Sequence, residues 1–165
     1  MIKKLNFGCG SDIRKGWDNC DLQEGAPIQF DFNKFPYPLK KNNYDYVLIY
    51  TVLENISNPD KALYELREKC KEGAIIDITA PYWNNKGTWN DPSSKRGFNE
   101  FFFGLIAERP ARYYIDSKPR FEIVELELVP TNVGKWVPKI IREKLSTFIS
   151  GMIMHVHVKM KVINK

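Results

Sequence analysis

The sequence predicts an α/β domain whose strands form a mostly parallel sheet. Short apolar segments alternate with a helical pattern, glycines follow the first apolar segment directly, and acidic residues close the next two. Glycines after a strand, with an acidic residue at the end of the next strand, are typical of a nucleotide held at the edge of a parallel sheet. We therefore expect a nucleotide-like cofactor at that edge.

The composition indicates a soluble globular protein. Its 165 residues are 43% hydrophobic and 27% charged, which fits one folded domain over residues 1–165 and excludes a disordered chain. No apolar run is long enough to span a bilayer, and the start of the chain does not resemble a signal peptide. The three cysteines form no CxxC pair, and the carboxylates are scattered, so we expect no disulfide framework, no metal and a cytoplasmic location.

The net charge of +5 is unevenly placed. Residues 1–60 carry seven Lys and Arg against eight Asp and Glu, whereas residues 130–165 carry seven basic residues against Glu143 alone. This basic segment fits two interpretations. It is a solvated helix face, or it attracts nucleic acid, acidic glycans or a membrane surface.

The first part of the chain predicts four closely spaced strands, at residues 3–7, 18–22, 27–32 and 44–53. About ten residues separate the first two strands, and about five separate the next two. A parallel connection usually needs a dozen or more residues with a helix inside. We therefore expect trimmed helices near the first three strands and one thinly covered sheet face. The gap would be covered by a second subunit in a homodimer or by nearby aromatic side chains: Phe30, Phe32, Phe35 and Tyr37.

Residues 58–73 predict a helix, with Asn58 or Ser57 as its cap, Pro59 in its first turn and Gly73 at its end. The later elements are a buried strand at 74–83, a loop at 84–100, a helix at 98–109, an alternating strand at 120–129, an amphipathic helix at 137–153 and an alternating strand at 155–163. We expect the last two strands to pair antiparallel at one edge of the sheet.

Several motifs occur together over nearly the whole chain: LNFGCGSD, GWDNCDL, FDFNKFPYPLKKNNYDYVLIYTVLENI and GAIIDITAPYW. In combination they resemble the class I S-adenosylmethionine (SAM)-dependent methyltransferases of the type 11 group. The resemblance implies a Rossmann-like, seven-stranded sheet in the order 3-2-1-4-5-7-6 with the last strand antiparallel. It also implies SAM at the carboxyl ends of the first four strands, and methyl transfer that leaves S-adenosylhomocysteine.

The residues at this expected site suit SAM. Gly8 and Gly10 permit a tight turn and close approach of the cofactor, and the third glycine of GxGxxG is absent, which counts against a dinucleotide. Asp21 would accept the ribose hydroxyls, and Asp31 would meet the adenine amine. The expected cofactor-binding residues are Asn6, Phe7, Gly8, Cys9, Gly10, Asp21, Leu22, Asp31, Phe32, Tyr50 and Thr51.

The sequence departs from its relatives after the fourth strand. Relatives often carry histidines on both sides of V-L-E, where this chain has Thr51 and Asn55. An acidic residue is also common two places before the first glycine, where this chain has Asn6. Glu54 remains, but it fits a charge at the start of a helix at least as well as a catalytic group.

An aromatic and polar segment after the fifth strand resembles the acceptor loop of the family. The expected catalytic residues are Asp91 and Tyr82, although Asp91 before Pro92 also fits a simple turn. Arg96 would bind an anionic acceptor or pair with Asp91. The expected substrate-binding residues are Trp83, Trp89, Ser94 and Arg96. His155 and His157, on one face of the last strand, are interpreted as a structural or solvent-exposed face in preference to a catalytic pair.

Three functions stay open. Methylation of a small molecule or a glycan is favoured, because aromatic rings with a few polar groups suit such acceptors. Methylation of RNA or protein is the alternative that the basic C-terminal segment supports. A SAM-binding protein without catalytic activity is the alternative that the missing histidines support.

Overall fold

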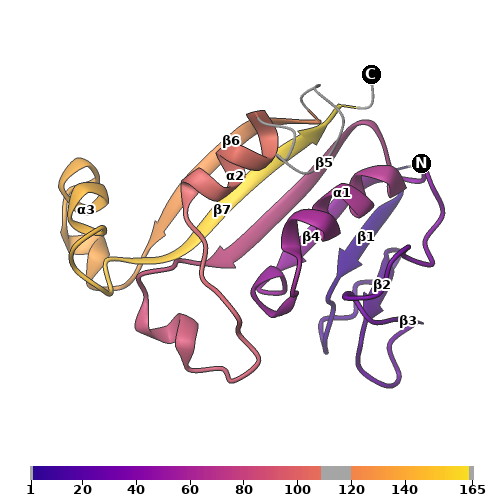
Figure 1. The fold of residues 1–165 in the computed structure, drawn as a ribbon, viewed down its shortest axis with the longest axis horizontal. Helices are drawn as coiled ribbons and strands as arrows, with labels where there is room; N and C mark the ends of the chain where they lie inside the picture. Colours follow the sequence, from indigo (N-terminus) through magenta and orange to yellow (C-terminus); the bar gives the residue numbers. More distant parts are fainter. Residues whose placement is uncertain (1, 109–119, 164–165) are drawn as a thin grey trace.

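The expected strands assemble into one mixed sheet (Figure 1). The computed structural model describes residues 2–108 and 120–163, and its strand order is β3-β2-β1-β4-β5-β7-β6. The strands are β1 (Lys4–Phe7), β2 (Asp18–Asp21), β3 (Ile28–Gln29), β4 (Tyr44–Tyr50), β5 (Cys70–Pro81), β6 (Phe121–Pro130) and β7 (Ile153–Val162). Strands β1 to β5 pair in parallel, and β7 runs antiparallel between β5 and β6. The predicted order and directions are therefore confirmed.

Some predicted boundaries are wrong. The strand expected at 27–32 contains only the two residues of β3, and the helix expected at 137–153 contains only α3 (Lys139–Leu145), followed by turns. Helix α1 (Pro59–Lys69) begins with its proline, but Asn58 makes no side-chain cap and Gly73 is not at its end. The helix ends earlier because Cys70 already pairs with Tyr44 as the first residue of β5.

Helices α1 and α2 (Glu100–Glu108) lie on the same face of the sheet (Figure 1). Helix α2 lies within the helix expected at 98–109, whose last residue is outside the described residues. Fully buried side chains of the strands form the core beneath the two helices, among them Val47, Ile49, Val156, Val158 and Met160. Their alternation along β4 and β7 is the pattern of strands that bury one face under helices. No helix among the described residues has the length and apolar character needed to cross a membrane.

The chain from β1 to β4 contains no α-helix, as predicted, and aromatic side chains take its place. Phe32 stacks on Phe7 of β1 with ring centroids 4.0 Å apart, and Tyr37 lies 5.6 Å from the same ring. The cluster also meets α1, since Glu65 accepts a hydrogen bond from the backbone N–H of Tyr37 at 3.0 Å. These side chains cover this part of the sheet within one chain.

The opposite face of the sheet bears polar side chains that bond to one another. Asp77 of β5 accepts a hydrogen bond from the hydroxyl of Tyr46 and lies 2.8 Å from Nε2 of His157. Trp17 meets the ring of Tyr46 edge-on, with centroids 5.7 Å apart. Among the described residues this face has no covering α-helix, so the expectation of a thinly covered face is confirmed.

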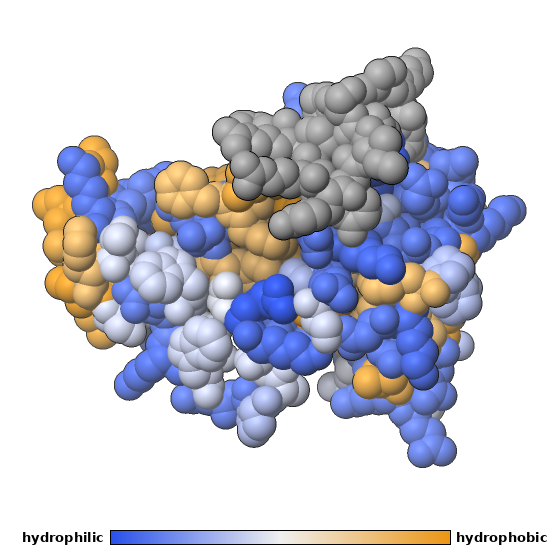
Figure 2. All heavy atoms as spheres, viewed as in Figure 1, coloured by the Kyte–Doolittle hydropathy of each residue, from blue (hydrophilic) through white to orange (hydrophobic). Residues whose placement is uncertain are grey.

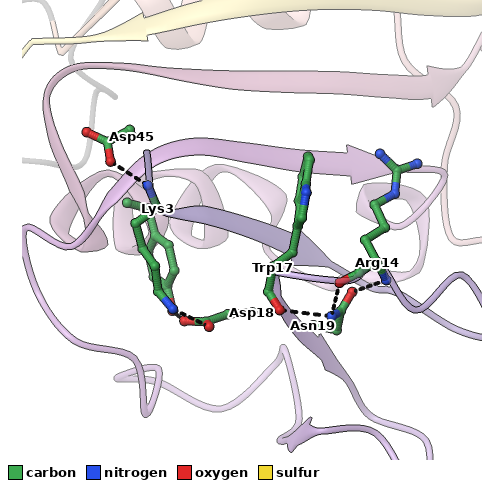
Figure 3. A network of polar contacts seen from close by, with 7 residues as sticks. Lys3, Arg14, Trp17, Asp18, Asn19 and Asp45 are labelled. Atoms are coloured by element: carbon green, nitrogen blue, oxygen red, sulfur yellow. Dashed lines mark hydrogen bonds and ion pairs between the residues drawn. The ribbon is translucent and has the colours of Figure 1, made fainter. Parts of the chain in front are cut away.

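A buried amide organises the connection between β1 and β2 (Figure 3). Asn19 donates to the backbone carbonyls of Arg14 and Trp17, each at 3.0 Å, and accepts from the backbone N–H of Arg14 at 2.9 Å. Nearby, the backbone N–H of Lys3 donates to Asp45 at 2.7 Å. Backbone groups of this connection thus find partners without a helix, as buried backbone groups must.

Candidate functional site

Two pockets lie at the carboxyl ends of the parallel strands. The glycine pocket, about 610 Å³, is lined by Asn6, Gly8, Cys9, Gly10, Ser11, Asp12, Asp21, Leu22, Gln23, Asp31, Phe32, Asn33, Tyr50, Thr51, Val52, Asn55, Ile56 and Ser93. The loop pocket, about 920 Å³, is lined by Thr51, Glu54, Asn55, Pro81, Asn85, Lys86, Gly87, Thr88, Asp91, Ser94, Thr131, Asn132, Val133, Ser150, Gly151, Met152, Met154 and His155. Thr51 and Asn55 line both pockets, so the two adjoin at the end of β4.

Every residue expected to bind the cofactor lines the glycine pocket except Phe7. Phe7 is fully buried, because its side chain points into the core and stacks on Phe32. Several other lining residues, including Asp12, Asn33 and Ser93, were not expected from the sequence, because they lie outside the strands, where the local pattern does not reveal which side chains face a pocket.

The glycines shape the floor of the glycine pocket. Gly8 and Gly10 have φ of +81° and +48°, a region that favours glycine. The backbone N–H groups of Gly8 and Cys9 both donate to the carbonyl of Cys20, at 2.9 and 3.0 Å. This turn therefore joins the end of β1 to the end of β2.

The two strand-end carboxylates reach the same pocket. Asp21 accepts hydrogen bonds from the backbone N–H groups of Gly10 at 2.8 Å and Gln23 at 3.0 Å. Asp31 accepts one from the backbone N–H of Asn33 at 2.9 Å. A carboxylate offers about four acceptor positions, so both groups keep capacity for a ligand's hydroxyl or amine.

Thr51 makes an unusual turn where the pockets meet. Its φ is +51°, which is uncommon for a β-branched residue, and its N–H donates to the carbonyl of Thr79 at 2.8 Å. The turn ends β4 and leads into the short helix η1 (Leu53–Asn55). Such backbone strain, of order 1–3 kcal/mol, persists only when the surrounding structure imposes it, and it concentrates at functional sites.

Glu54 is the buried ionisable group of the loop pocket. Its side chain is only 5% exposed, and its Oε2 has no hydrogen-bond partner among the described residues. Burial raises the pKa of Glu54 to about 7, and the charge of Asp91 adds to this rise. From the sequence, a helix-start charge fitted Glu54 at least as well as a catalytic group, because burial of a charged residue beside a pocket is not visible in the local pattern.

Asp91 lies at the exposed rim of the loop pocket. Its Oδ1 accepts from the backbone N–H of Ser93 at 2.8 Å and from the Ser93 hydroxyl at 2.7 Å. These hydrogen bonds lower the pKa of Asp91 below its ordinary value. The geometry is therefore compatible with a turn residue and with a catalytic residue, since Asp91 makes a turn with Ser93 and also lines the loop pocket.

The other residues expected around the acceptor divide into two groups. Ser94 lines the loop pocket, whereas Trp83, Trp89 and Arg96 line neither pocket. Arg96 donates to the backbone carbonyl of Ser57 at 2.8 Å. Tyr82 is buried and also lies outside both linings, with its hydroxyl 3.2 Å from Oγ of Ser146.

His155 lines the loop pocket, which sequence analysis did not anticipate. Strand β7 is antiparallel, so its beginning lies beside the end of β5, and His155 pairs in register with Pro81. Burial lowers the pKa of His155, so its imidazole is neutral at neutral pH. Two features of the sequence could have placed His155 in the loop pocket: the expected antiparallel direction of the last strand and the alternation of its side chains between the two faces of the sheet.

One group of possible metal ligands occurs among the described residues, formed by Glu125, Glu127 and His157. It lies outside the linings of both pockets. Lys159 already contacts Glu125 at 2.6 Å, and His157 lies 2.8 Å from Asp77, so two of its three members have other partners.

No protein-family profile matches the chain. No curated protein matches it by sequence. Solved structures do match it over nearly its whole length. A SAM-dependent methyltransferase from Archaeoglobus fulgidus is 16% identical with a TM-score of 0.70, covering 97% of this chain and 86% of its own.

Two further structures match at similar levels. A putative methyltransferase from Bacillus halodurans is 13% identical with a TM-score of 0.64, covering 98% of this chain and 93% of its own. The [4+2]-cyclase SpnF is 14% identical with a TM-score of 0.64, covering 98% of this chain and 74% of its own. At these identities the likeness concerns the fold, and the strand order agrees with it. The chain therefore has the fold of the class I SAM-dependent methyltransferases.

Proposed function

We propose that this protein is a SAM-dependent methyltransferase acting on a small molecule or a glycan. The observation that carries the proposal is the pair of adjoining pockets, which share Thr51 and Asn55 at the end of β4. A cofactor in the glycine pocket and an acceptor in the loop pocket would meet at this shared wall. Such adjacency is what a group transfer between two bound molecules requires.

The glycine pocket offers the groups that SAM needs. Asp21 has acceptor capacity for the ribose hydroxyls, Asp31 for the adenine amine, and Phe32 offers an apolar surface beside the base. A Cβ at Gly10 would meet nothing within 4 Å, so a ligand can approach the backbone there. When bound, SAM supplies an activated methyl group with its own leaving group, so orientation supplies much of the rate.

The loop pocket suits a neutral acceptor rich in hydroxyl groups. Its walls carry side-chain amides and hydroxyls, with apolar surface from Met152 and Met154. Among the described residues that line it, Glu54 and Asp91 carry carboxylates and Lys86 is the one Lys or Arg. This ratio of two carboxylates to one lysine disfavours RNA as the acceptor, because RNA binding depends on basic side chains that neutralise the phosphates.

Glu54 is the group we propose as the base for a hydroxyl acceptor. Glu54 lines the loop pocket, where its carboxylate would accept a proton from the hydroxyl group of a bound acceptor. A pKa near 7 suits a base that works at neutral pH. Asp91, with its lowered pKa and its bonds to Ser93, is the weaker candidate, and Tyr82 is held by Ser146.

The three buried cysteines form no disulfide, which suits the reducing cytoplasm that we propose as the site of the reaction. A SAM-binding role without methyl transfer is the second candidate, and it is favoured by the cyclase that shares this fold.

Two measurements test the proposal. Calorimetry with SAM should give saturable binding, and absence of binding at high micromolar SAM to folded protein would overturn it. Incubation of a cell extract with the protein and deuterated-methyl SAM, followed by mass spectrometry, should reveal a labelled small molecule or glycan. Binding without any labelled product would favour the second candidate, and label in RNA or protein would correct the acceptor class.

A further inference from the structure

The segment between β6 and β7 lies at one end of the sheet (Figure 1), and several of its large apolar residues are exposed. We call residues 132–150, which contain α3, the α3 arm. No residue of α3 is buried, and Trp136 and Phe148 are 90% and 85% exposed. The large exposed apolar residues of the arm are Val133, Trp136, Ile140, Ile141, Phe148 and Ile149. Figure 2 shows hydrophobic residues gathered at this end of the molecule.

Contacts within the arm, and with the chain after β5 and before β7, hold the arm in this orientation. Arg142 donates to the backbone carbonyl of Gly134 at 3.1 Å, and Asn84 donates to that of Ser146 at 2.8 Å. A Cβ at Gly134 would lie 2.0 Å from the backbone oxygen of Met152, so the arm approaches the base of β7 closely. The exposed apolar surface is therefore part of the folded structure, and gathered apolar residues of this kind are typical of interaction sites.

The same arm is strongly basic. Residues 132–150 carry four basic residues and one acidic residue, Glu143, a balance of +3. Lys135, Lys139 and Lys144 are all exposed. The contact between Lys139 and Glu143 is long, at 3.9 Å, and leaves the positive charge of the arm largely uncompensated.

This combination of charge and apolar surface selects one partner. A second copy of the chain would bring two basic arms together in a symmetric contact, which like charges oppose. A nucleic acid would use the lysines but leave the aliphatic side chains in water. An anionic bilayer satisfies both, because lysines meet the headgroups while Trp, Phe and Ile side chains enter the acyl boundary.

We propose that the α3 arm docks the protein onto the surface of an anionic phospholipid membrane. Trp136 suits this boundary, where aromatic rings with a polar group concentrate. The arm also contributes Asn132, Val133 and Ser150 to the loop pocket, so docking would bring that pocket to the lipid surface. The docking itself does not depend on the proposed methyl transfer.

Vesicle flotation with the whole protein tests this docking. We expect binding to phosphatidylcholine vesicles that contain about one third phosphatidylglycerol, weak binding to phosphatidylcholine alone, and weakening as salt rises. The double substitution Trp136→Ser with Phe148→Ser should reduce the bound fraction at least tenfold. Phe101→Ser is the matched control, because Phe101 is 71% exposed on α2, and it should bind as the wild type does.

Substitutions of charged residues provide a second test of the docking, because they leave the apolar surface of the arm unchanged. Lys135→Glu with Lys139→Glu should abolish binding to anionic vesicles, whereas Lys41→Glu, whose side chain is 71% exposed elsewhere, should not. Equal binding to neutral and anionic vesicles, or no effect of the arm substitutions, would overturn the proposal. So would a lipid-free dimer in sedimentation that the serine variant converts to monomer, or RNA binding lost only in the lysine variant.

Discussion

Gly8 lies so close to Val52 that a Cβ on Gly8 would be 2.2 Å from Cγ2 of Val52. Gly8 follows β1 and Val52 follows β4, so this contact fixes the two strand ends that frame the glycine pocket. A larger residue at this position would require the side chain of Val52 to shift.

Gly8→Ala should therefore destabilise the protein more than Gly10→Ala. Both positions have positive φ, which costs an alanine roughly 1–2 kcal/mol, but only Gly8 adds an overpacking cost of about 1–3 kcal/mol. Denaturant unfolding of the two variants measures the difference. Equal stabilities would mean that Val52 moves aside without cost.

Asp21→Ala should weaken SAM binding by on the order of 2 kcal/mol, because two charge-assisted bonds to the ribose would be lost. Asp21 also bonds the backbone of Gly10 and Gln23, so the free energy of unfolding must be measured beside the calorimetric affinity. Asp21→Asn keeps one acceptor oxygen and should lose less. An affinity change below threefold for Asp21→Ala in a folded protein would rule out the ribose role.

Glu54 should make the protein less stable as the pH rises. Its pKa in the folded state, about 7, is above its ordinary value of 4.5, so between these pH values the folded state binds more protons than the unfolded state. The free energy of unfolding should then fall by on the order of 3 kcal/mol from about pH 4.5 to about pH 7 through this group. Glu54→Gln should remove this part of the slope, and an unchanged slope would show that Glu54 keeps an ordinary pKa.

Glu54→Gln should also lower turnover by roughly 10²-fold or more once an acceptor is known, with SAM affinity nearly unchanged. Wild-type turnover should fall as the pH drops below about 7, because protonated Glu54 cannot act as a base. Asp91→Asn is the matched variant, since asparagine also makes the turn with Ser93, and it should stay within threefold of the wild type. If Asp91→Asn lost turnover and Glu54→Gln kept it, Asp91 and not Glu54 would be the base.

Asn19→Ala should destabilise the protein by about 2–3 kcal/mol. The substitution leaves the backbone carbonyls of Arg14 and Trp17 without their shared donor in the helix-free connection. Thermal unfolding of Asn19→Ala beside Asn33→Ala, an exposed asparagine, measures the effect. A similar small loss in both variants would mean that water replaces the amide.

The sequence by itself determined the sheet and the edge where the glycine pocket lies. The apolar segments, the glycines after β1 and the acidic ends of β2 and the third strand segment are local patterns. Parallel pairing necessarily brings the ends of such segments to one edge. The short connections likewise excluded covering helices, because a chain of about five residues has no room for one.

Only the tertiary structure decided which side chains face the loop pocket. Glu54 lies there because Thr51 turns the chain at the end of β4, and His155 lies there because β7 runs antiparallel to β5. The tertiary structure also left the apolar residues of α3 exposed, which the prediction of an amphipathic helix at 137–153 did not decide. Periodicity specifies which residues share a face, whereas the packing of distant segments decides whether that face meets core, ligand or solvent.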